Sequence, residues 1–166
     1  MRIVHMQRVG TPSIEQGLLN QAVSFYNGGS RCMADTYITP LVTNSPMAPA
    51  IVCFAFAAEL YLKLLHTIAV GSPSKGHDLK ELFGVLPQEA QDAVAKEFGN
   101  GDLAGQINTA STAFVHWRYQ HEHETLTVNL DTLINFAKAV HKVVRHLRPD
   151  LEVFGENHVA RFFEAV

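Results

Sequence analysis

The sequence contains one long apolar segment, IVCFAFAAELYLKLLHTIAV, which occupies residues 51–70. It follows Pro49 and ends just before Gly71, and these residue types are common at the start of a helix and just past its end. Alanines at positions 55, 57 and 58 would let neighbouring helices approach closely. The segment therefore predicts a central helix around which the rest of the chain packs.

Two charged residues, Glu59 and Lys63, interrupt this segment near its middle. Both charges would be costly in lipid, so we expect a buried helix of a soluble protein and no membrane partner. The two residues are four apart with the glutamate first, which is the favourable order for an ion pair on one helix face. A helical ion pair is the simplest interpretation of Glu59 and Lys63.

The remaining chain also has mainly helical patterns. Apolar residues at steps of three and four from Ile14 to Tyr26 predict a first helix, which Gly28 and Gly29 are expected to end. Three prolines among serines and threonines in residues 30–49 predict a long loop between the first two helices. Further helices are predicted after an N-cap at Asp78, after Pro87 at Gln88–Phe98, from Leu103 to about His121, and from Leu130 to Leu147.

These elements predict an all-α fold, a four- or five-helix up-and-down bundle with a long loop between the first two helices. A chain of 166 residues with 47% hydrophobic residues has the size and composition of a single domain. We expect one domain over residues 1–166, with its core at about 14–147 and a C-terminal extension at 148–166.

Charge and cysteine content restrict the environment and the partners. A net charge of −3 argues against a protein that coats nucleic acid, and leaves room for a focal RNA contact. Of the two cysteines, Cys53 lies in an apolar run and is interpreted as a small buried hydrophobe rather than half of a disulfide. Residues 1–10 have no uninterrupted apolar stretch followed by a small-residue cleavage site, so we do not expect secretion. We therefore expect a cytoplasmic protein.

A second informative stretch is Trp117-Arg118-Tyr119-Gln120-His121-Glu122-His123, at the end of a predicted helix. Arginine can hold a phosphate and histidine can move a proton near neutral pH, and together they suffice for RNA cleavage through the 2′-hydroxyl without a metal. On a straight helix a separation of five residues turns by about 140°. Arg118 and His123 would therefore meet only where the helix frays or bends, or across the axis of a symmetric dimer. The spacing by itself favours a pair of surface or structural residues, which many helix ends carry, over a catalytic pair.

Two other polar patterns leave alternatives open. His116, His121, His123, Glu122 and Glu124 are dense in sequence, but cysteine ligands and a His-Glu-x-x-His spacing are absent, so no metal is expected. The predicted last helix of the bundle carries a cationic stripe, formed by Lys138, His141, Lys142, Arg145 and Arg148. This stripe fits either a solvated helix face or a track for RNA.

Three motifs occur in an order that resembles the HEPN superfamily. They are Phe56-Ala57-Ala58-Glu59-Leu60-Tyr61-Leu62-Lys63, Gly76-His77-Asp78-Leu79-Lys80-Glu81-Leu82 and Trp117-Arg118-Tyr119. The resemblance implies a small α-helical bundle, in many members dimeric, of the kind found in toxin–antitoxin, phage-defence and RNA-processing systems. Many members are metal-independent endoribonucleases marked by an arginine, four to six residues and a histidine.

Carried onto this sequence, the resemblance makes Arg118 and His123 the expected catalytic residues. Glu59, Lys63, Tyr119 and His121 become the expected substrate-binding residues, without a metal or another cofactor. Active members usually have Asn, Asp or His straight after the arginine, where this chain has Tyr119. Two hypotheses follow: a homodimeric endoribonuclease acting on RNA, with an antitoxin as partner in a toxin or defence role, or a non-catalytic module that binds a nucleotide or a partner.

Overall fold

The computed structural model describes residues 13–34, 37–38, 43–44, 47–99, 102–111, 116–117 and 127–153. These residues form six helices and one pair of two-residue strands, and the predicted all-α fold is confirmed. The helices are α1 (Ile14–Ala34), α2 (Met47–Val70), α3 (Leu79–Gly84), α4 (Gln88–Phe98), α5 (Leu103–Ala110) and α7 (Leu130–Leu147).

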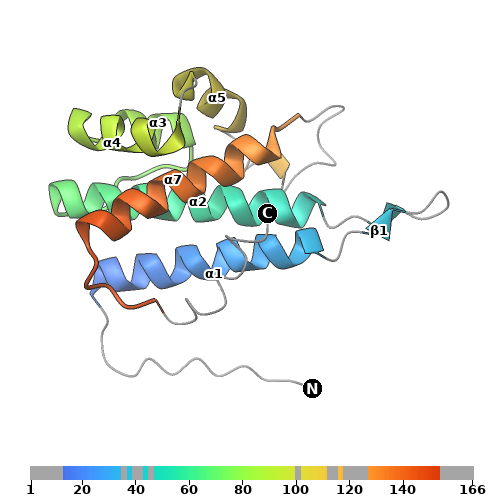
Figure 1. The fold of residues 1–166 in the computed structure, drawn as a ribbon, viewed down its shortest axis with the longest axis horizontal. Helices are drawn as coiled ribbons and strands as arrows, with labels where there is room; N and C mark the ends of the chain where they lie inside the picture. Colours follow the sequence, from blue (N-terminus) through green and yellow to red (C-terminus); the bar gives the residue numbers. More distant parts are fainter. Residues whose placement is uncertain are drawn as a thin grey trace.

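Helix α2 is the central helix, as its sequence predicted, and lies between α1 and α7 (Figure 1). Helix α1 runs antiparallel to α2, whereas α7 runs parallel to it. The shorter helices α3, α4 and α5 lie on the side of the molecule away from α1. α2 is long and apolar enough to cross a membrane, but 67% of its most apolar window is buried within the fold. Such burial is what the core helix of a soluble domain shows.

Helix α1 continues through Gly28 and Gly29 to Ala34, so the predicted end at these glycines is wrong. Gly29 is buried against Phe54 of α2, and a β-carbon at this position would lie 3.0 Å from three atoms of the phenyl ring. Tyr26 packs edge-on against the same ring, with the ring centroids 5.1 Å apart. Gly29 therefore serves the close approach of two helices rather than the end of one.

The loop predicted at residues 30–49 is shorter than expected, because α1 extends into it and α2 begins at Met47. Between the two helices, β1 (Tyr37–Ile38) pairs antiparallel with β2 (Thr43–Asn44). The prediction of a loop missed this pair because two residues are too few to show an alternating pattern. Pro49 lies inside the first turn of α2, where a helix has no backbone partner for its N–H groups.

Side-chain oxygens of aspartate and asparagine residues cap the N-termini of several helices. Asp78 caps α3 as predicted: its carboxylate accepts hydrogen bonds from the backbone N–H groups of Lys80 and Glu81, at 2.9 and 3.0 Å. Asn129 caps α7 in the same way, through the N–H of Thr132 at 3.1 Å. The predictions of helices at Gln88–Phe98 and Leu130–Leu147 are confirmed. Of the helix predicted from Leu103 to about His121, α5 covers the first part, and residues 112–115 and 118–121 lie outside the described residues.

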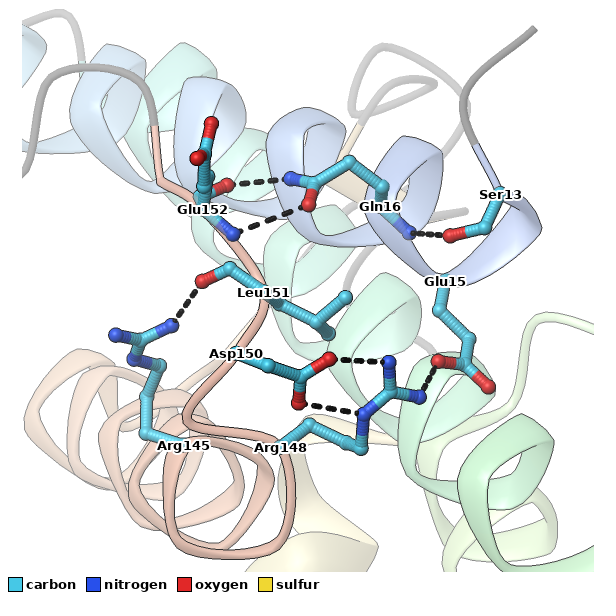
Figure 2. A network of polar contacts seen from close by, with 8 residues as sticks. All are labelled: Ser13, Glu15, Gln16, Arg145, Arg148, Asp150, Leu151 and Glu152. Atoms are coloured by element: carbon cyan, nitrogen blue, oxygen red, sulfur yellow. Dashed lines mark hydrogen bonds and ion pairs between the residues drawn. The ribbon is translucent and has the colours of Figure 1, made fainter.

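The residues that follow α7 turn back onto the first turn of α1 (Figure 2). Arg148 donates two hydrogen bonds to Asp150, at 2.8 and 2.7 Å, and also pairs with Glu15 of α1. The Gln16 amide bonds the backbone of Glu152 at both its N–H and its carbonyl oxygen. Hydrogen bonding to the guanidinium lowers the pKa of Asp150 to about 2. We call these contacts the clasp, because they hold residues 148–153 against the beginning of α1.

Candidate functional site

The candidate site is built around the carboxylate of Glu59, which is buried in the middle of α2 with 1% of its side chain exposed. Lys63, one helical turn later, donates from Nζ to Oε1 of Glu59 at 2.8 Å. The ring of His77 approaches from another segment, with its Nδ1 3.0 Å from Oε1 and 3.1 Å from Oε2. The predicted ion pair of Glu59 and Lys63 is therefore present, and it has a third member.

The backbone before α3 brings His77 to this carboxylate. Gly76 has a φ of +99°, a left-handed conformation that favours glycine, and it turns the chain just before His77. Asp78 then caps α3, and the N–H of the next residue, Leu79, donates to the carbonyl oxygen of Ser111 at 3.0 Å. The site consequently joins α2, the start of α3 and the end of α5.

Electrostatics explain why this set of side chains belongs together. A buried carboxylate is costly for the fold unless charges and hydrogen-bond donors compensate it. Lys63 supplies the opposite charge and the His77 ring supplies a second donor, with side chains 16% and 59% exposed respectively. The site therefore connects a buried negative charge to two donors that reach solvent. Such an arrangement can bind an anionic group or transfer a proton through the imidazole.

The predicted site residues fall into two groups. Glu59 and Lys63 are in contact, whereas Arg118, Tyr119, His121 and His123 all lie outside the described residues. Trp117, the residue before Arg118 in the chain, is half-buried and packs against the hydrophobic core. Of the histidine and glutamate cluster considered for metal binding, His116 alone is described. Within the described ranges, no three His, Cys, Asp or Glu side chains are placed to hold one ion.

His77 is the functional candidate that sequence reasoning missed. The sequence places it in the Gly76-His77-Asp78-Leu79 stretch, but no pattern there predicts a role for its side chain. His77 lies 18 positions after Glu59 in the chain, beyond the second half of α2 and the turn that follows, so no local spacing relates the two. The available signal was a histidine directly before a helix cap, after a glycine suited to a left-handed turn.

The cationic stripe of α7 is neither a uniformly solvated face nor a continuous track. His141 is largely buried and its ring stacks on Tyr61 of α2, with ring centroids 5.1 Å apart. Burial, aided by the nearby Arg145 cation, lowers the pKa of His141 to about 4. Arg145 donates to the carbonyl oxygen of Leu151 at 2.5 Å, and Lys142 pairs with Glu97 of α4 at 3.7 Å. Most of these side chains are engaged within the domain.

A groove of about 800 Å³ lies away from Glu59, between the last turns of α2 and α7 and the length of α4. Its lining mixes apolar side chains, such as Ile68 and Val143, with charges of both signs. The Lys142 and Glu97 ion pair belongs to this lining. Of the predicted site residues that the structure describes, Glu59 and Lys63, neither lines this groove.

Comparison with known proteins gives a family and a fold. The family model described as HEPN domain matches residues 43–147, which is more than half of the chain. The crystal structure of TT1696 from Thermus thermophilus is similar, with a TM-score of 0.53 and 18% identity over 81% of this chain and 96% of that one. At this identity the likeness concerns the fold alone. The comparison with curated proteins found no match. Since the family model spans α2 to α7 and includes the Glu59, Lys63 and His77 site, the chain belongs to the HEPN domain family.

Proposed function

We propose that this protein is a metal-independent endoribonuclease in which Arg118 and His123 carry out the chemistry. Arg118 holds the scissile phosphate and stabilises the charge that develops on it, and His123 transfers a proton. The attacking group is the 2′-hydroxyl of the RNA, which restricts the substrate to RNA. Glu59, Lys63, Tyr119 and His121 contribute to substrate binding in this proposal.

One observation carries the proposal: a buried carboxylate in the core of a small domain, paired with donors that reach solvent. Glu59 is 1% exposed, while Lys63 and His77 extend from it toward the surface. An apolar residue in its place would avoid the cost of burying a charge, so such a cluster is a candidate for function. The Ser111 and Leu79 hydrogen bond ties the end of α5 to this cluster, and the Arg118 to His123 segment follows α5 in the chain.

The test is cleavage of a labelled RNA by the purified full chain in excess chelator. We expect cleavage products that end in a 2′,3′-cyclic phosphate, and no cleavage of the same sequence made of DNA. Arg118→Ala and His123→Ala should each slow cleavage by about 10² or more, the usual contribution of such groups. Arg31→Ala and His146→Ala are matched controls, because both residues are exposed and lie on α1 and α7. Equal rates for all five proteins, or cleavage that chelator abolishes, would contradict the proposal.

The proposal includes a cytoplasmic homodimer in which the two copies share one cleft. A dimer would place two arginines and two histidines around one substrate, which removes the need for Arg118 and His123 to meet on one helix. Sedimentation velocity measures the mass directly. Mixing the Arg118→Ala and His123→Ala chains then tests the shared cleft, because a mixed dimer regains one complete site only if each site uses both copies. We further propose a toxin or phage-defence role, with an antitoxin protein as partner.

A non-catalytic module is the second candidate, and Tyr119 favours it because active members usually have another residue type directly after the arginine. In this case the region of Glu59, Lys63 and Arg118 binds a nucleotide or a partner protein. Calorimetric titration with nucleotides separates the two candidates. Heat of binding without RNA cleavage supports the module, whereas the absence of heat with a monomeric chain counts against it.

A further inference from the structure

The contact between His77 and Glu59 fixes how the imidazole is protonated. Both oxygens of Glu59 lie within 3.1 Å of Nδ1. A carboxylate has no proton to donate, so the ring nitrogen that contacts it carries the hydrogen. In the neutral ring, Nε2 then has the lone pair and accepts protons. Glu59 is in turn held in position by Lys63, at 2.8 Å.

This arrangement has the parts of a proton-transfer pair. A buried carboxylate that accepts from Nδ1 orients a histidine and stabilises the imidazolium that forms when Nε2 takes up a proton. Glu59 is buried, so water competes little for its oxygens, while the His77 side chain is 59% exposed. The orienting group is therefore shielded and the reacting group is accessible.

We infer that His77 is a second proton-transfer group for RNA cleavage, with Glu59 as its positioning residue. The inference rests on the proposed endoribonuclease function and adds to it, because cleavage of RNA without a metal requires two proton transfers. Nε2 of His77 removes the proton of the 2′-hydroxyl as this oxygen forms its bond to phosphorus. The bond between phosphorus and the 5′-oxygen breaks, and that oxygen takes a proton from His123. The products are a 2′,3′-cyclic phosphate and a free 5′-hydroxyl, and water then restores both histidines.

The same contacts would also exist if His77 served only to connect α2 to α3. His77→Asn separates the two roles, because the asparagine amide lies near the position of Nδ1 and can still donate to Glu59, but cannot transfer a proton. His66→Asn is the matched control, since the Nδ1 of His66 lies 2.6 Å from the carbonyl oxygen of Ser72 and takes no part in the site. Thermal unfolding of both variants reports whether the fold is kept.

The assay is single-turnover cleavage of the RNA by the full chain over a range of pH. We expect a bell-shaped profile for the native chain, the result when one group acts as base and another as acid. His77→Asn should lower the rate by about 10² or more and remove one limb of the bell, while His66→Asn keeps the native profile. Glu59→Gln, which removes the charge that stabilises the imidazolium, should lower the rate at saturating RNA and shift the limb of the bell that His77→Asn removes. A folded His77→Asn variant that keeps the native rate and both limbs overturns the inference.

Two further measurements, NMR of the histidine rings and rescue by imidazole, also test the role of His77. Nitrogen-15 NMR of labelled histidine should show His77 protonated at Nδ1 in the native chain, and the opposite tautomer overturns the inference whether or not RNA is cut. If His77→Asn does not fold, His77→Gly with added imidazole replaces it: restored cleavage supports the role, and a folded variant without rescue overturns it. A native chain that cuts no RNA overturns the proposed function together with this inference. Native cleavage with an active His77→Asn variant overturns this inference alone.

Discussion

Acid should destabilise the domain through His141, whose ring is largely buried against Tyr61. The pKa of His141 is about 4 in the folded chain, against an ordinary value of 6.5. As the pH falls, the unfolded chain therefore takes up a proton at this position before the folded chain does. The part of the folding stability that depends on a neutral His141 ring is fully present above about pH 6.5 and is lost progressively down to about pH 4. At about 1.4 kcal/mol per pKa unit, the whole loss is about 3 kcal/mol, and about 2 kcal/mol of it has occurred by about pH 5.

The perturbation that isolates this effect is His141→Phe, which keeps an aromatic ring against Tyr61 and removes the titrating nitrogen. Urea unfolding followed by circular dichroism at about pH 7.5 and about pH 5 gives the free energy of unfolding for each protein. The native chain should lose about 2 kcal/mol more than the variant between the two pH values. Val140→Ala changes the neighbouring buried residue and serves as a control. It should lower the free energy of unfolding by the same amount at both pH values, because it changes packing and no charge. The reasoning would be refuted if the native chain and His141→Phe lost the same free energy of unfolding between the two pH values.

Two other predictions concern helices. Gly28→Ala should stabilise the domain by up to about 1 kcal/mol, the difference in helix propensity, since the added β-carbon would lie 3.6 Å from Sγ of Cys53, an ordinary contact. Gly29→Ala should instead destabilise it by about 1 kcal/mol or more, because its β-carbon would lie 3.0 Å from the buried Phe54 ring. Thermal unfolding of the two variants tests both predictions. Changes of the same sign would contradict the conclusion that Gly29, unlike Gly28, is needed for the close approach of α1 to α2. Asn129→Ala should cost about 1 kcal/mol by removing the N-cap of α7, whereas Asn129→Asp, which can still accept the hydrogen bond, should cost much less in the same unfolding measurement.

The sequence predicted elements well where apolar periodicity and caps agreed. The central helix around residues 51–70, the Asp78 cap and the helix at Leu130–Leu147 are all present, because each depends on residues close to one another in the chain. The end of α1 could not be predicted in this way. A glycine pair also marks the end of many helices, and only the position of Phe54 shows that Gly29 is needed for close packing.

In the candidate site too, the sequence predicted contacts between residues that are close together in the chain and missed a contact that depends on the tertiary fold. Glu59 and Lys63 could be paired because they are one helical turn apart. His77 reaches Glu59 through the tertiary fold, by a left-handed turn at Gly76. The spacing of these two residues in the sequence therefore does not predict their contact. The roles of Arg118, Tyr119, His121 and His123 remain predictions from the sequence motif. The RNA assays above test them directly.

The clasp and α1 extend the packed helical bundle beyond the region that the family model matches. The match covers residues 43–147 and therefore omits both α1 and the segment that Arg148 and Glu152 fasten to it. A fragment cut at those limits would expose the α2 surface that Tyr26 and Gly29 cover, including Phe54, to water. Expression designs and domain fusions should therefore retain residues 13–153, with tags joined outside the clasp. In this chain the two flanks of the matched region meet each other and close the helical bundle around it.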